Sequence, residues 1–227
     1  MKKFITAVFA LALAFTFAQS AFAQQSSPDE PKTLFGSEPF KHGGYGALVT
    51  KISQVDGEVA YMAGAKGAWL VNGTFSLGIG GYGLTSRHLY DNVAFTSENW
   101  FNGVPDTIRR TGRLEMSWGG LQIGYINNPN DIIHLTGSVL IGGGVAAFTT
   151  RTSHMDWDDD DWDNWEHKGA GFYAVEPEIG LEINVVKFMR VEFQAGYRQV
   201  WGLELEKVND KKLSGPTGSL SLKFGKF

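Results

Sequence analysis

The 227-residue sequence contains no cysteine. A disulfide framework is therefore excluded, and so is a lipid-modified cysteine at a processed N-terminus. The sequence also has no excess of basic residues, since its net charge is −4 at pH 7. This argues against nucleic acid as a partner. Beyond residue 23 no apolar run is long enough for a transmembrane helix. Glycine (29 residues) and aromatic residues (13%) are abundant instead, and this combination favours an all-β protein.

The first 23 residues, MKKFITAVFALALAFTFAQSAFA, have the three parts of a secretory signal peptide. Two lysines give a basic start, the apolar run 4–18 follows, and Ala21-Phe22-Ala23 is a cleavage site of the small-x-small type. The run is shorter than the roughly 20 residues of a membrane-spanning helix, so we predict cleavage rather than an anchor. Residues 24–42 are polar and rich in proline, and we expect a flexible periplasmic leader there. Residues 43–227 would form the folded domain.

Eight segments of this domain alternate between apolar and polar residues with a period of two, the signature of a β-strand. In the fourth of them the apolar parity changes at Gly119-Gly120, and we expect a β-bulge at this glycine pair. The segments are 44–52, 58–71, 75–85, 113–126, 132–150, 172–186, 190–203 and 217–227.

Short and long connections alternate between these segments, except that the first connection, 53–57, is short. Those after the third, fifth and seventh segments are long, and the others are short. Outer-membrane barrels sort their loops in this way, with short periplasmic turns and long external loops. We therefore predict an all-β fold: an eight-stranded antiparallel up-and-down transmembrane β-barrel in the bacterial outer membrane. It would be a monomer whose main partner is outer-membrane lipid. A soluble exported β-barrel that holds an apolar ligand remains an alternative.

The assignment of faces also predicts two turns. Val71 and Phe75 should both face lipid, so the turn between them should hold three residues, Asn72-Gly73-Thr74, although Asn-Gly alone suggests a two-residue turn. The same parity predicts an odd-numbered turn centred near Lys187.

The stretch from HGGYGALV to GGYGL resembles a largely uncharacterised group of small exported Gram-negative outer-membrane barrel proteins. The motifs are Gly43-Gly44-Tyr45-Gly46, then a long hairpin, then Gly80-Gly81-Tyr82-Gly83-Leu84. The resemblance covers most of the domain in pattern but only its first third in residues. It implies a fold and a compartment, and no activity.

The end of the chain, SLSLKFGKF, resembles the assembly signal of such barrels, a last strand closed by an aromatic residue. Phe227 lies in the opposite register from Leu220, Leu222 and Phe224. A bulge near Gly225 would bring it onto the lipid-facing side.

The segment FYAVEPEIGLEINVV (172–186) places a row of glutamates opposite its apolar residues. If the apolar face meets lipid, the glutamates point into the barrel, where a charge is costly unless it is paired. The next segment carries charges on the matching face, and eight strands leave an interior just wide enough for side chains. We therefore predict a filled interior with a charge network of six residues: Glu176, Glu178, Glu182, Arg190, Glu192 and Arg198.

The pairing of these two segments makes this prediction more specific. If they pair around Lys187, Glu176 or Glu178 falls opposite Arg198. Asn184 or Glu182 then falls near Arg190.

The stretch HMDWDDDDWDNWEH (154–167) is the most acidic part of the chain. Closely spaced oxygen ligands suit Ca²⁺, but an EF-hand loop counted from Asp156 needs Gly and Glu where Asp161 and His167 stand. The stretch has two interpretations: a solvated acidic loop, or a contact site for a divalent cation or a surface glycan. The candidate contact residues are Asp156, Trp157, Asp158, Asp160, Trp162 and Trp165.

No catalytic, cofactor or metal site is predicted. None of the five histidines forms a metal-binding pair of the H-E-x-x-H type. His134 and Ser138 share a strand face but lie about 13 Å apart, so we expect His134 to be an interior hydrogen-bonding residue. The predicted function is a non-enzymatic barrel that displays long external loops for structural or interaction roles. The alternatives are a narrow pore or small-solute transporter, and a lipid-modifying enzyme whose Ser–His–acid constellation would have to form across strands.

Overall fold

The structure is a computed structural model that describes residues 41–98, 105–149 and 168–227. Residues 41–227 form one compact unit. The signal peptide and nearly all of the leader lie outside the described residues, so both assignments stay predictions. No helix in the described part of the chain is long and apolar enough to cross a membrane.

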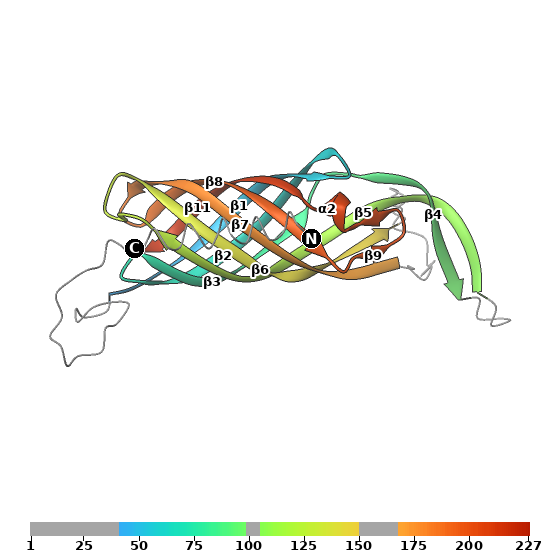
Figure 1. Cartoon of the computed structure of the whole chain (residues 1–227), viewed down its shortest axis with the longest axis horizontal. Coiled ribbons are helices and arrows are strands. Elements are labelled where there is room, and N and C mark those ends of the chain that lie inside the picture. The colour runs from blue at the N-terminus through green and yellow to red at the C-terminus, as the bar shows by residue number, and fades with distance from the viewer. Residues whose placement is uncertain (1–40, 99–104, 150–167) are drawn as a thin grey trace, which may run out of the picture. The chain divides into compact units, whose positions relative to one another are not determined.

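Eight strands form a closed antiparallel barrel (Figure 1). Their order around the barrel is β3-β2-β1-β11-β8-β7-β6-β5, and β5 pairs back with β3 to close it. The predicted eight-stranded up-and-down barrel is therefore confirmed. The strands are β1 (His42–Val55), β2 (Glu58–Val71), β3 (Phe75–Leu84), β5 (Pro105–Ile126), β6 (Ile133–Thr149), β7 (Lys168–Val186), β8 (Met189–Trp201) and β11 (Gly215–Lys226).

The outer face of the barrel is apolar. Along each strand the side chains alternate between this face and the interior. Large aliphatic residues such as Leu48, Ile79 and Ile179 expose 66%, 67% and 73% of their surface. A contiguous band of this kind is not found on a water-soluble monomer.

Exposed aromatic residues lie near both ends of this apolar band. Such girdles are typical of transmembrane barrels, where aromatic rings sit at the membrane–water interfaces. They are Trp69, Tyr125 and Phe188 near one end, and Tyr61, Tyr173 and Tyr197 near the other.

The turn between β2 and β3 has the predicted length. Val71 pairs with Phe75, which leaves the three residues Asn72-Gly73-Thr74, and Thr74 N donates to the Val71 carbonyl at 3.1 Å. Asn72 and Gly73 have φ angles of 55° and 70°, a left-handed conformation that these two residue types adopt at little cost.

The predicted odd-numbered turn near Lys187 is wrong. Val186 pairs with Met189, so the turn holds two residues, Lys187 and Phe188. A β-bulge between Asn184 and Val186 supplies the extra residue. Beyond the bulge Asn184 pairs with Arg190, so the register is centred on Lys187 and the assignment of faces is unchanged.

The predicted bulge at Gly119-Gly120 is also wrong. β5 pairs with β6 without interruption from Arg113 to Ile126. Leu114, Met116 and Trp118 lie inside the barrel, each exposed by 4% or less. The prediction assumed that every apolar row faces lipid, whereas part of the interior is itself apolar.

Phe227 turns inward without a bulge, because β11 and β1 pair continuously from Gly218 to Lys226. Its ring stacks on Tyr45 with ring centroids 6.1 Å apart. The guanidinium carbon of Arg190 lies 4.0 Å from the centroid of the Phe227 ring. The bulge expected near Gly225 is therefore wrong, and Phe227 packs at the end of the interior where the short turns lie.

The opposite end, which we call the external end, carries the long connections. β4 (Leu89–Glu98) pairs with the first part of β5, and the two strands extend past the barrel (Figure 1). A folded segment covers the mouth, with β9 (Glu204–Leu205), β10 (Val208–Asn209) and α2 (Asp210–Leu213). Its Leu213 is fully buried, and the Lys212 carbonyl accepts a hydrogen bond from Asp56 N at 2.8 Å. Both segments were predicted as loops.

The apolar exterior gives a direct test of membrane insertion. We expect the purified protein to remain folded in cold detergent and to change its gel mobility when boiled, because the band of exposed aliphatic and aromatic residues needs an apolar solvent. Mobility before and after boiling, with circular dichroism of the unboiled sample, measures this. Recovery of folded monomer from the periplasm without detergent would contradict a membrane barrel.

Candidate functional site

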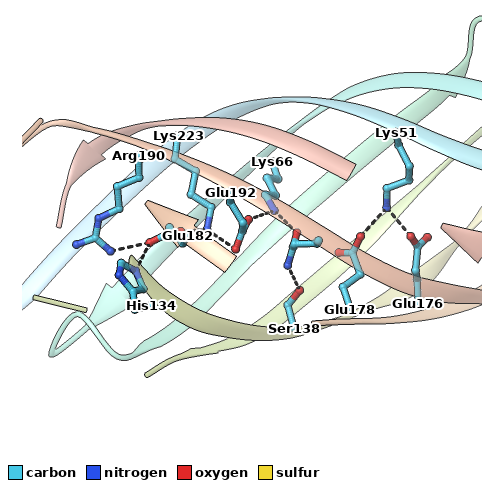
Figure 2. A network of polar contacts seen from close by, with 11 residues as sticks. Lys51, Lys66, His134, Ser138, Glu176, Glu178, Glu182, Arg190, Glu192 and Lys223 are labelled. Carbon is cyan, nitrogen blue, oxygen red and sulfur yellow. Dashed lines mark hydrogen bonds and ion pairs between the residues drawn. The ribbon is translucent and has the colours of Figure 1, made fainter. Parts of the chain in front are cut away.

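The interior of the barrel holds a network of charged side chains (Figure 2). Its members come from six strands and are almost completely buried. We call it the charge network: Lys51, Lys66, His134, Glu176, Glu178, Glu182, Arg190, Glu192 and Lys223.

One part of the network ties β1 to β7 across the interior. Lys51 Nζ lies 2.5 Å from Glu176 Oε1 and 3.1 Å from Glu178 Oε1. The same ammonium group lies 4.2 Å from the centroid of the Tyr82 ring. A single lysine therefore forms ion pairs with two glutamates and also faces an aromatic surface, which stabilises a buried cation.

A second part links three strands around Glu192 of β8. Lys66 of β2 and Lys223 of β11 each lie 2.8 Å from a carboxylate oxygen of Glu192. Lys66 Nζ also donates to Gln194 Oε1 at 2.9 Å, and Gln194 Nε2 donates to Ser138 Oγ at 3.1 Å. Both oxygens of Glu192 are thus paired.

Glu182 is the meeting point at the short-turn end. Arg190 Nη1 donates to Glu182 Oε1 at 2.8 Å, and His134 Nε2 lies 2.9 Å from the same oxygen. Lys223 forms an ion pair with the other oxygen. His134 is therefore an interior hydrogen-bonding residue, as the sequence predicted, and its Nδ1 lies 3.2 Å from the Asp131 carbonyl.

The predicted partner of Arg190 is confirmed. Asn184 lies opposite Arg190 in the register, and Glu182 accepts its hydrogen bond. Arg190 Nη2 also donates to the Pro129 carbonyl at 3.3 Å.

Arg198 behaves differently. The pairs on either side, Val175 with Gln199 and Glu178 with Gly196, place Glu176 opposite Arg198 as expected. No ion pair joins the two, however, because Glu176 reaches Lys51 instead. Arg198 Nε donates to the Leu213 carbonyl at 2.9 Å and Nη1 to Met62 Sδ at 3.2 Å, while Nη2 has no hydrogen-bond partner among the described residues. The expected Glu–Arg198 pair is therefore wrong.

All six charged residues named from the sequence lie inside the barrel, but their counter-ions were mostly missed. The three lysines of the network, Lys51, Lys66 and Lys223, were not assigned a role. Strand parity could have found them, because each alternates with outward-facing residues on its own strand. Parity alone does not say which strand faces which across the interior, so the pairing needed the closed structure.

The interior changes character toward the external end. Beyond Lys51 most of the large inward side chains are aliphatic or aromatic and almost fully buried, exposed by 7% or less, although Ser53 and Thr217 also point inward there. We call this group the external apolar layer: Met62, Leu84, Leu114, Met116, Phe148 and Phe172.

A small cavity lies within the barrel interior. This cavity of about 10 Å³ lies among Tyr45, Gln122, Thr136, Glu192 and Lys223, which is room for about one water molecule. Within residues 41–98, 105–149 and 168–227, no three or more His, Asp or Glu side chains are placed to hold a metal ion. The acidic loop with Asp156 and Trp157 lies outside the described residues, so its contact role stays a prediction.

The paired charges predict an asymmetry between two lysines of β11. Lys223→Met removes the cation that Glu182 and Glu192 share and leaves the buried network with one uncompensated negative charge, and we expect a loss of about 3–5 kcal/mol of unfolding free energy. Lys226→Met is the matched control, because Lys226 is exposed on the same strand, and it should change stability by less than about 0.5 kcal/mol. Urea titrations of both variants in detergent measure the difference. Equal midpoints would show that the network does not stabilise the barrel.

We expect a smaller loss of stability when Arg198 is replaced. Arg198→Met removes a buried cation that has no ion pair among the described residues, so it should destabilise the barrel less than Lys223→Met. The same titration compares the two variants. A larger loss for Arg198→Met would mean that this arginine is paired in solution after all.

Neither a protein-family model nor a curated protein matches the chain. Among solved structures it is similar to Neisserial surface protein A (NspA), at 8% identity and a TM-score of 0.51, over 84% of this chain and 100% of that one. It is also similar to Ail from Yersinia pestis, at 12% identity and a TM-score of 0.43, over 81% and 97% of the two chains. OprG from Pseudomonas aeruginosa matches at 8% identity and a TM-score of 0.43, over 81% and 95%.

The likeness to NspA concerns the fold alone. The chain has the fold of a small outer-membrane barrel, which confirms the resemblance noted in the sequence. Together with the apolar exterior, this confirms the predicted location in the bacterial outer membrane.

Proposed function

We propose that the chain is a sealed outer-membrane barrel whose working surface is its external end. The observation that supports this most directly is the filled interior. The charge network and the external apolar layer lie one after the other along the barrel, and side chains occupy the space that a pore would need.

The external apolar layer is the stronger barrier of the two. Met62, Leu114 and Phe148 are each exposed by 2% or less and offer no oxygen ligand to replace the hydration shell of an ion. Moving a charge without paired ligands through an apolar region costs several kcal/mol. The carboxylates of the network below this layer already form ion pairs with Lys51, Lys66 and Lys223, which weakens their attraction for a passing cation.

The external end supplies surface for interaction. β4 and the first part of β5 project beyond the barrel (Figure 1), and among the described residues the first part of β5 pairs with β4 alone. Arg109 is half exposed there and lies 3.5 Å from Glu206. Lys207 Nζ donates to the Asp91 carbonyl at 2.8 Å and so connects β4 to the segment that covers the mouth. These contacts support a preformed external platform at the end of the barrel where β4 ends and β7 begins.

Planar-bilayer recording tests the sealed interior. The native protein should give no steady ion conductance, because charged pairs and the apolar layer fill the path. A steady conductance would contradict the proposal and favour the pore or small-solute transporter.

A matched variant makes this test sharper. The triple substitution of Lys51, Glu176 and Glu178 by alanine removes the cross-barrel tie without changing net charge by more than one unit, and it leaves the external apolar layer in place. It should therefore remain closed. If Leu114→Ser combined with Phe148→Ser also leaves the bilayer current unchanged, the apolar layer is not the barrier.

A further inference from the structure

Three polar side chains meet at the external rim, apart from the charge network. They are Ser86 and His88, which follow β3, and Glu58 at the start of β2. Ser86 Oγ lies 2.9 Å from His88 Nε2, and His88 Nδ1 lies 3.3 Å from Glu58 Oε2. A hydroxyl, an imidazole and a carboxylate are therefore connected in series through the two nitrogens of one ring.

The hydrogen bonds of Ser86 give each group a definite role. Tyr61 N donates to Ser86 Oγ at 3.0 Å, so the hydroxyl oxygen is held as an acceptor and its own proton is free to point at His88 Nε2. An accepting Nε2 places the ring proton on Nδ1, which then donates toward Glu58. This is the arrangement in which a histidine removes a proton from a serine and a carboxylate orients the ring.

The backbone holds these groups in place. Ser86 N and Thr85 N donate to the Tyr61 carbonyl at 3.3 Å and 2.8 Å. Two residues later the His88 carbonyl accepts a hydrogen bond from Leu114 N at 2.9 Å. The short stretch between β3 and β4 is thus fixed against β2 on one side and β5 on the other.

The exposure of the three side chains agrees with these roles of nucleophile, base and positioning residue. His88 is 4% exposed, so its ring is held by packing. Ser86 is partly exposed, and the Glu58 side chain is 76% exposed, so the series opens to the external side of the barrel. The interior pair named from the sequence differs, because His134 contacts Glu182 and the Asp131 carbonyl rather than Ser138.

We propose that Ser86, His88 and Glu58 form a serine hydrolase site that cleaves carboxylic esters at the external end of the barrel. Ser86 Oγ attacks the ester carbonyl carbon while its proton passes to His88 Nε2. The carbon–oxygen bond to the alcohol breaks, and the alcohol leaves with that proton. Water then attacks the acyl-serine and gives a proton to His88. Release of the carboxylic acid returns that proton to Ser86 Oγ. Glu58 is a positioning residue that stabilises the protonated ring.

The surroundings of the rim favour a lipid ester as the source of the substrate. Tyr61, whose backbone contacts Ser86, is 54% exposed on the outer face, and Leu89, next to His88, is 66% exposed. Both belong to the apolar surface at the external end. An acyl ester in the adjoining leaflet is therefore within easier reach than a soluble ester. This proposal departs from the expectation of a non-enzymatic barrel and does not depend on whether the interior conducts.

Covalent labelling tests the nucleophile in the intact protein. A fluorophosphonate probe should form a phosphorus–oxygen bond at Ser86 with loss of fluoride, and peptide mass mapping of the native barrel identifies the labelled residue. Ser117→Ala is the control, since Ser117 is exposed on the outer face of β5, and it should label as the native protein does. Labelling at no serine, or equally at Ser117, would overturn the proposal.

Ester hydrolysis tests the base and the positioning residue. The probes are a nitrophenyl butyrate in solution and a diacyl phospholipid in detergent micelles. We expect Ser86→Ala and His88→Gln to lower the rate by about 1,000-fold. Glu58→Gln should lower kcat by about 10-fold with little change in KM, and Glu58→Asp should restore part of it. Boiling shifts on gels show that each variant is folded.

The two probes also separate the sources of substrate. Faster cleavage of the phospholipid supports a membrane ester, and cleavage of the butyrate alone would replace it with a soluble one. If native protein and Ser86→Ala hydrolyse both probes at the same rate, the three residues only fasten the rim together and the proposal is wrong.

Discussion

The barrel depends on the neutralisation of charge in a space without bulk water. Four glutamates point inward, and none of them would be tolerated there alone, because an isolated buried carboxylate is far too costly. Lys51, Lys66 and Lys223 bring the opposite charge from three different strands. Backbone hydrogen bonds determine which strands are neighbours. The ion pairs add a second constraint, because they determine which strands face one another across the interior.

The interior has a polar half near the short turns and a mainly apolar half near the external end. Near the short turns, polar side chains satisfy one another, and Phe227 packs over Tyr45 and Arg190. Near the external end, Leu114 and Phe148 pack as in a water-soluble core. Arg198 lies where the halves meet, and this explains why its hydrogen bonds go to a carbonyl and to a sulfur atom. The external rim, with Ser86 and His88, begins where the second half ends.

Most of the fold could be predicted from the sequence because strand parity and loop lengths are local properties. The barrel strands, the turn at Asn72-Gly73-Thr74 and the inward row of glutamates followed from them. Parity fails where inside and outside have the same polarity, and so Leu114 and its neighbours were placed on the lipid face. The series from Ser86 through His88 to Glu58 was also not predictable, since it needs a contact between His88 and Glu58, which are 30 residues apart.

The cross-barrel position of two lysines has a mechanical consequence. Lys51 and Lys66 join strands that are not neighbours in the ladder, so each acts as a strut between facing walls. A hollow cylinder of eight strands could flatten into an ellipse under lateral pressure without breaking a single ladder hydrogen bond. Flattening along the line that joins the paired charges would separate these charges or force them too close together, and no bulk water is present to solvate them. The ion pairs of Lys51 and Lys66 therefore resist a change in the cross-section of the barrel.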